Sequence, residues 1–178
     1  DLMYAMMLPS ANEGAMMVAD YVGDGSQEAF VEMMNAKAKE IGALNTHFSN
    51  ATGLYDENNY STAYDMALIA RYAMQNPDFV EIVTTRAYTS QPTPRYPDGI
   101  PWYSSNYMQI QSHKEYYYEG LKGIKTGTLP AQNMRNFIST ASRDGYSYLL
   151  VVMGAPTKDD KGQRYQYNLA FWDTRDLY

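Results

Sequence analysis

The first part of the chain repeats apolar residues with the period of amphipathic helices, about 3.6 residues. The first such stretch follows Ser10 and Glu13, which have the spacing of a capping box, so a helix is predicted over residues 10–22. A second apolar stripe predicts a helix over residues 27–41. The apolar run 2–8 is interpreted as a lead-in to the first helix.

Two more helices are predicted after residues 43–60, which lack a helical period, are rich in Asn, Thr and Gly, and are interpreted as an irregular connection. Ser61 and Thr62 precede a further apolar stripe and are expected to cap a third helix. Asn76 and Pro77 end that helix and begin a short fourth one, because proline suits the first turn of a helix.

The second half of the chain changes to the pattern of strands. Residues 82–88 are interpreted as a strand, and the four prolines within residues 91–101 require an extended or looping excursion. Two β-rich runs, 137–142 and 146–153, flank the turn Arg143–Gly145. Because Asp-Gly between two such runs is a strong hairpin signal, an antiparallel pair is predicted here.

The last segment, residues 164–178, carries apolar and aromatic residues and is predicted to be a helix packed on this sheet. The pattern therefore predicts an α+β protein, in which a helical subdomain is followed by an antiparallel sheet and a C-terminal helix closes that sheet. With 178 residues, the chain is expected to be one domain or a large part of one.

Composition narrows the function classes. The net charge of −6 and the isoelectric point near 4.8 argue against a nucleic-acid partner, which requires a basic face. The chain has no cysteine, which excludes disulfides, thiolate catalysis and cysteine-based zinc sites. No run of about 18 apolar residues occurs, so no membrane-spanning helix is predicted. The two histidines, His47 and His113, are far apart in sequence, and His47 is interpreted as a structural residue. No metal or cofactor is predicted.

The stretch Gly123–Thr128 concentrates a cation, hydroxyls and bare backbone in consecutive positions. On an extended strand, side chains alternate between faces, so Lys125 and Gly127 are expected to share one face and Thr126 the other. A glycine in a strand lets a ligand approach the backbone closely. This combination suits an extended substrate that ends in a carboxylate.

Ser10 and Asn12 form a Ser-x-Asn pattern at the predicted start of a helix. Ser-x-Asn followed by Lys-Thr-Gly on a later strand is the second and third part of a three-part signature of active-serine, penicillin-interacting enzymes. The first part, Ser-x-x-Lys, supplies the nucleophile and base. No serine of this sequence has a lysine three places on, and in these enzymes that helix lies upstream, so it is expected before Asp1.

The sequence resembles the serine D-alanyl-D-alanine carboxypeptidases, which are the low-molecular-mass penicillin-binding proteins. Two departures are Ala11, where Gly or Asp is more usual, and Asn133, where the family often has Gly. The resemblance implies a β-lactamase/transpeptidase-like fold, of which residues 1–178 are a partial catalytic domain. It spans nearly the whole chain and is carried by Leu8–Asn12, Asn45–Phe48, Thr52–Leu54, Tyr60–Ala67, Gly120–Thr128 and Arg143–Gly145.

The resemblance also implies roles for the site residues. Ser10 passes a proton to the leaving nitrogen, and Asn12 hydrogen-bonds the acyl-side amide of the substrate. Lys125 attracts the terminal carboxylate and orders the Ser10 hydroxyl, so the two side chains are expected within hydrogen-bond reach. Thr126 and Thr128 bind the same carboxylate, and the Thr128 N–H is one oxyanion donor.

The implied reaction is removal of the terminal D-alanine from peptidoglycan stem peptides through an acyl-serine, outside the cytoplasm, with β-lactams as inhibitors. The alternatives are a class A β-lactamase, although no Glu-x-x-Leu-Asn stretch lies between Asn12 and Lys125, and an inactive peptidoglycan-binding fragment. Loss of the nucleophile helix is expected to leave apolar surface, covered by the missing N-terminal segment or a second chain.

Overall fold

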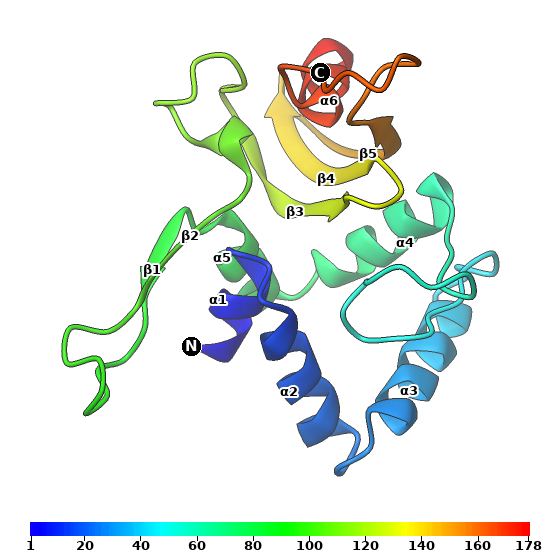
Figure 1. Cartoon of the computed structure of the whole chain (residues 1–178), viewed down its shortest axis with the longest axis vertical. Coiled ribbons are helices and arrows are strands. Elements are labelled where there is room, and N and C mark those ends of the chain that lie inside the picture. Colours follow the sequence, from blue (N-terminus) through cyan, green and yellow to red (C-terminus); the bar gives the residue numbers. More distant parts are fainter.

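The computed structural model describes residues 1–178 as helices around a small sheet, with a two-stranded arm beside them (Figure 1). The chain contains the helices α1 (Leu2–Met7), α2 (Asn12–Val22), α3 (Gln27–Glu40), α4 (Ala63–Ala73), α5 (Pro77–Thr84) and α6 (Leu169–Leu177). The strands are β1 (Ala87–Thr89), β2 (Pro101–Tyr103), β3 (Leu121–Leu129), β4 (Met134–Arg143) and β5 (Tyr146–Pro156). Helices precede the main sheet, and α6 packs on it, which confirms the predicted α+β class.

Three helix starts are fixed by side chains that accept hydrogen bonds from the first-turn backbone. Ser26 accepts from the Ala29 N–H at 3.1 Å and so begins α3. Thr62 and Asn76 do the same for α4 and α5, from backbone N–H groups at 3.1 and 2.9 Å. The cap predicted at Thr62 and the helix predicted to begin at Asn76-Pro77 are therefore confirmed.

The predicted cap at Ser10 is wrong. Helix α2 begins two residues later, at Asn12, its N-cap residue is Ala11, and no side chain caps it. Ser10 has a backbone φ of +64°, in the left-handed region, and its side chain bonds elsewhere. The apolar lead-in is itself the helix α1, which packs against α2 and turns into it through this strained residue.

The main sheet has the strand order β3-β4-β5, all antiparallel. Strands β4 and β5 pair up to Arg143 and Tyr146, which leaves a two-residue loop of Asp144 and Gly145. Their φ angles are +52° and +82°, and positive φ at both central residues is what a type I′ hairpin turn requires. The predicted hairpin is confirmed.

Successive residues of β4 point to opposite faces of the sheet and pack into two separate cores. Phe137 is 1% exposed and packs edge-on against Phe171 of α6, with their ring centroids 4.9 Å apart. Its neighbour Ile138 packs on the opposite side, against a cluster formed by Ala70 of α4, Val83 of α5 and Ile124 of β3. The sheet is therefore held between α6 on one face and α4 and α5 on the other.

Two predicted element boundaries need correction. In the strand predicted over residues 82–88, residues 82–84 are the end of α5, and strand pairing starts only at β1, which pairs with β2 at the base of the proline-rich arm. The C-terminal helix begins at Leu169 rather than 164, because the Asn168 side chain accepts from the Ala170 N–H at 3.1 Å. No helix is long and apolar enough to cross a bilayer.

Helices α2 and α3 lie at the end of the molecule away from the main sheet (Figure 1), and several of their apolar side chains are exposed. Tyr21 is 88% exposed, and Met17 and Met33 are more than half exposed. Soluble monomers rarely expose large apolar patches, and where such patches occur they mark interaction sites. These exposed side chains are consistent with a surface that a further segment or chain covers, but that the nucleophile helix packs there stays a prediction.

Candidate active site

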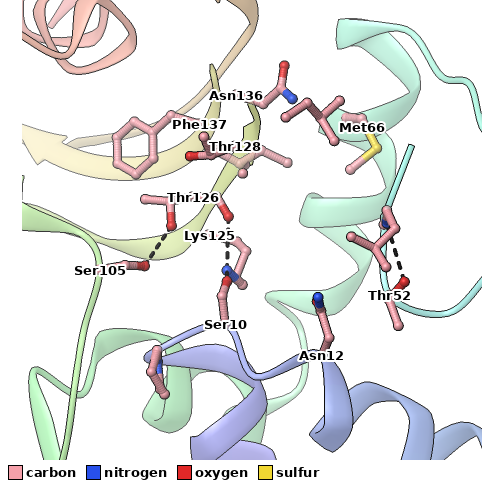
Figure 2. Close-up of a pocket in the computed structure, with 16 residues that line it drawn as sticks. Ser10, Asn12, Thr52, Met66, Ser105, Lys125, Thr126, Thr128, Asn136 and Phe137 are labelled. Carbon is pink, nitrogen blue, oxygen red and sulfur yellow. Dashed lines mark hydrogen bonds between the residues drawn. The ribbon is translucent and has the colours of Figure 1, made fainter. Parts of the chain in front are cut away.

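A pocket of about 630 Å³ lies between the turn at the start of α2, the edge of β3 and the loop before α4 (Figure 2). Of the residues singled out in the sequence, Ser10 and Asn12 border it from one side and Lys125 to Thr128 from the other. The remaining lining residues are Pro9, Thr52, Gly53, Leu54, Met66, Ser105, Leu129, Asn136, Phe137 and Ile138. All six predicted site residues thus meet at one cavity.

The wall that carries Ser10 is held in place by the turn between α1 and α2. Leu8 is only 2% exposed and anchors the turn in the interior. The Ala11 N–H donates to the Ala5 carbonyl at 3.1 Å, and the Leu8 carbonyl accepts from the Ser105 N–H at 3.1 Å. These bonds hold Ser10 in its left-handed conformation, which turns its hydroxyl toward the pocket.

Lys125 spans the pocket and joins the two walls. Its ammonium donates to the Ser10 hydroxyl and to the Thr126 carbonyl oxygen, the latter at 2.9 Å (Figure 2). Burial lowers the pKa of Lys125 from 10.5 to about 8, because removing an ammonium from water disfavours its charged form. At neutral pH it still carries a proton, so the pocket has one half-buried positive charge.

Thr126 also borders the pocket, although alternation along the strand predicted it on the opposite face. Strand β3 is an edge strand of its sheet, so the pocket extends around its open edge and reaches side chains of both faces. The Thr126 hydroxyl lies 2.6 Å from the Ser105 hydroxyl. Gly127 faces Asn136 of β4, and a Cβ there would meet that side chain at ordinary contact distance.

The third wall is the loop of residues 50–54, which is held by side-chain hydrogen bonds. Asn50 Oδ1 accepts from the backbone of Thr52 and Gly53, at 3.2 and 2.8 Å. Asp65, buried in the first turn of α4, accepts from the Asn45 N–H at 2.6 Å and the Thr46 hydroxyl at 2.9 Å, at the start of the same connection. These hydrogen bonds give the loop a defined conformation at the edge of the pocket, although its sequence predicts only an irregular connection.

His47 has the structural place that was expected for it. Its ring Nδ1 lies 2.6 Å from the Asn58 carbonyl oxygen, and its backbone pairs with that of Tyr60. It does not border the pocket. No cluster of acidic or histidine side chains that could hold a metal ion occurs in the structure.

Sequence reasoning missed three polar residues of the pocket: Thr52, Ser105 and Asn136. Asn136 faces Gly127 across the ladder and accepts from the Gly154 N–H at 2.8 Å. Its position nine residues after the Lys-Thr-Gly stretch, on the next strand, could have suggested a place beside that stretch. Ser105 gave no such signal, because its contacts with Leu8 and Thr126 are distant in sequence.

Comparison with known proteins agrees with this geometry. The family profile described as D-alanyl-D-alanine carboxypeptidase matches residues 1–157. The chain is 30% identical over 183 residues to the D-alanyl-D-alanine carboxypeptidase DacF of Bacillus subtilis, covering all of this chain and 44% of that protein. It is 33% identical over 162 residues to the D-alanyl-D-alanine carboxypeptidase of Streptomyces sp. strain K15, covering 86% of this chain and 53% of that protein.

Among solved structures, the crystal structure of the Streptomyces K15 DD-transpeptidase is similar with a TM-score of 0.78 and 32% identity. That match covers 87% of this chain and 60% of the solved one. The chain spans about half the length of the curated relatives it matches. Since the family profile covers most of its residues, the chain belongs to the D-alanyl-D-alanine carboxypeptidase family.

Proposed function

We propose that this chain binds the D-Ala-D-Ala end of peptidoglycan stem peptides, as part of a serine D-alanyl-D-alanine carboxypeptidase that acts outside the cytoplasm. The observation that carries the proposal is the hydrogen bond from Lys125 to Ser10, which joins two motifs 115 positions apart in one pocket. Residues 1–178 then form a partial penicillin-binding, transpeptidase-like catalytic domain, which a Ser-x-x-Lys segment completes.

In the proposed reaction, the serine of Ser-x-x-Lys attacks the carbonyl carbon between the two D-alanines. A C–O bond to the serine forms, the peptide C–N bond breaks, and the leaving amine takes a proton and departs as D-alanine. The lysine of Ser-x-x-Lys takes the proton of the attacking serine hydroxyl. Ser10 delivers a proton to the leaving amine and regains one from that lysine; its hydroxyl faces the pocket and is held by a hydrogen bond from Lys125. Water then hydrolyses the acyl-serine ester.

The proposed substrate lies along the open edge of β3. The Lys125 ammonium attracts its terminal carboxylate, and the hydroxyls of Thr126 and Thr128 donate to that carboxylate. Gly127 leaves room for the peptide backbone next to the strand. Asn12, which is exposed at the rim, hydrogen-bonds the acyl-side amide, and the Thr128 N–H contributes to the oxyanion hole.

Two kinds of partner follow from this proposal. β-Lactams resemble the D-Ala-D-Ala end and compete for the same pocket. The exposed apolar side chains of α2 and α3, such as Met17 and Met33, favour a covering partner, which is either the segment with Ser-x-x-Lys or a second chain. The acidic net charge argues against nucleic acid, as stated above.

The test is to place the Ser-x-x-Lys region of a family member in front of these 178 residues and to measure D-alanine release. We expect release from N,N′-diacetyl-L-Lys-D-Ala-D-Ala and slow turnover of penicillin. Ser10→Ala is the matched variant, and it should release D-alanine far more slowly while remaining folded. Rapid multiple-turnover hydrolysis of penicillin would instead identify a β-lactamase.

The inactive binding fragment is tested separately with the 178-residue chain. N-acetyl-D-Ala-D-Ala is titrated into it and followed by nuclear magnetic resonance, with N-acetyl-L-Ala-L-Ala as the control. If the 178-residue chain binds the D-peptide but the fused protein releases no D-alanine, the result would support an inactive binding fragment over the enzyme. No preference for the D-peptide would contradict the proposed pocket altogether.

A further inference from the structure

Ser105 lies between the two walls of the pocket and contacts both. Its backbone N–H donates to the Leu8 carbonyl at 3.1 Å, in the turn that carries Ser10. Its side-chain hydroxyl lies 2.6 Å from the Thr126 hydroxyl, next to Lys125 (Figure 2). It is half-buried and borders the pocket, so it is close to any ligand that Thr126 contacts.

The residues around Ser105 hold it rigidly. Asn106 is 3% exposed and donates through Nδ2 to the Gly123 carbonyl at 3.0 Å. Gln109 is 2% exposed, donates through Nε2 to the Ser104 hydroxyl at 2.8 Å, and accepts from the Gly123 N–H at 3.4 Å. Both backbone groups of Gly123 are thus fixed to this segment, two residues before Lys125. Ser105 therefore has little freedom to move away from Thr126.

The hydroxyl pair of Ser105 and Thr126 can be arranged in two directions, because either oxygen can donate. A carboxylate in the pocket accepts hydrogen bonds only, so it selects the arrangement in which Thr126 donates to it. Ser105 then donates to the Thr126 oxygen. Donation into a hydroxyl that itself donates to a charged acceptor strengthens both bonds.

We propose that Ser105 is a positioning residue that orients the Thr126 hydroxyl toward an anionic ligand end and so favours free carboxylates over carboxamides. This inference rests on the proposed function and adds a specificity residue to it. A carboxamide oxygen is a neutral acceptor, and hydrogen bonds to charged groups are about twice as strong as those to neutral ones. Ser105 should therefore matter more for the acid than for the amide.

The experiment compares two ligands on the 178-residue chain. N-acetyl-D-Ala-D-Ala and its C-terminal carboxamide are titrated at pH 7 and followed through the backbone amides of Gly127 and Thr128. Ser105→Ala is expected to weaken binding of the acid by about fivefold, within the range of one neutral hydrogen bond such as that between the two hydroxyls, and of the amide by less than twofold. Ser105→Thr keeps the hydroxyl and should restore the preference for the acid.

Two further variants keep the outcome clear. Ser112→Ala removes an exposed serine that does not border the pocket and should change neither affinity. If Ser105→Ala does not fold, judged by its thermal unfolding, Ser105→Cys replaces it, because a thiol is a weak donor of similar shape.

The outcomes separate this inference from the proposed function. A lower affinity for the acid, a nearly unchanged affinity for the amide and rescue by Ser105→Thr support the role of Ser105. An equal loss for both ligands, or no loss, overturns that role while leaving the proposed function intact. A wild-type chain that binds the acid no better than the amide overturns both.

Discussion

Lys125 holds Ser10 by a hydrogen bond, although 115 positions separate the two residues in the sequence. The same ammonium donates to the Thr126 carbonyl at 2.9 Å, on its own strand. One half-buried cation therefore connects the turn between α1 and α2 to the edge of β3. Because burial also lowers the pKa of Lys125 to about 8, both its charge and its contacts can be tested.

The 178-residue chain alone should not be labelled covalently by a fluorescent penicillin. The sequence contains no Ser-x-x-Lys, and acylation in this family is proposed to occur at that serine. Intact-mass spectrometry after incubation checks this, with denatured chain as the control for non-specific reaction. A stable adduct that maps to Ser10 would contradict the expectation and make Ser10 a nucleophile.

Lys125→Met should reduce the affinity for N-acetyl-D-Ala-D-Ala by about tenfold, since it removes the positive charge of the pocket, and tenfold corresponds to about 1.4 kcal/mol. The same change should raise the free energy of unfolding at pH 7. The lowered pKa of Lys125 sets an upper bound of about 3 kcal/mol on this gain.

The size of this gain in the free energy of unfolding depends on pH. Below about 8 the ammonium is charged in both states, so wild type bears the full cost of burying it. Between about 8 and 10.5 the folded state releases the proton first, and the stability of wild type rises with pH. Urea unfolding of both chains at pH 7 and pH 10 measures this. A variant less stable than wild type at pH 7 would show that Lys125 stabilises the fold instead.

Binding of the acid should fall as the pH rises through about 8, because Lys125 loses its charge there. Above that value the affinity is expected to drop with the protonated fraction and to level off about tenfold lower, at the affinity of the Lys125→Met chain. Titrations between pH 6 and 10 measure the midpoint. The Lys125→Met chain is the control, and its affinity should not have this midpoint; an unchanged wild-type affinity up to pH 10 would contradict the role of the ammonium.

Asp65→Ala should destabilise the protein by about 2 kcal/mol, because it leaves two donors, the Asn45 N–H and the Thr46 hydroxyl, without their acceptor. Hydrogen exchange should speed up in residues 44–61, which include one wall of the pocket. The matched control is Asp56→Ala, which removes a half-buried carboxylate that accepts from the Asn58 N–H. Equal effects of the two changes would show that burial of Asp65 is unimportant.

The elements predicted correctly are those whose signals are local. Thr62 and Asn76 cap helices through residues two or three positions away, and Asp144-Gly145 forms its turn from its own backbone preferences. Asn133, which stands where the family often has Gly, has a φ of +53°, so the position requires the left-handed region that glycine adopts most easily. Such features can be inferred from short stretches of sequence.

The errors have the opposite cause. Ser10 has the sequence of a cap, but its hydroxyl is used by Lys125, and no local pattern shows that partner. The strand predicted over residues 82–88 does not begin at residue 82, because residues 82–84 belong to the helix that Pro77 begins. There Val83 packs with Ala70 and Ile124. Ser105 was missed for the same reason, since both of its contacts come from other parts of the chain.

The left-handed backbone at Ser10 limits which residues evolution or design can place there. A φ of +64° is costly for β-branched side chains and is tolerated best by Gly, Asn and Asp. Threonine, the usual conservative exchange for serine, is therefore a poor replacement, although it carries the same hydroxyl. Among the residues with an aliphatic hydroxyl, only serine combines that group with a backbone that can make this turn.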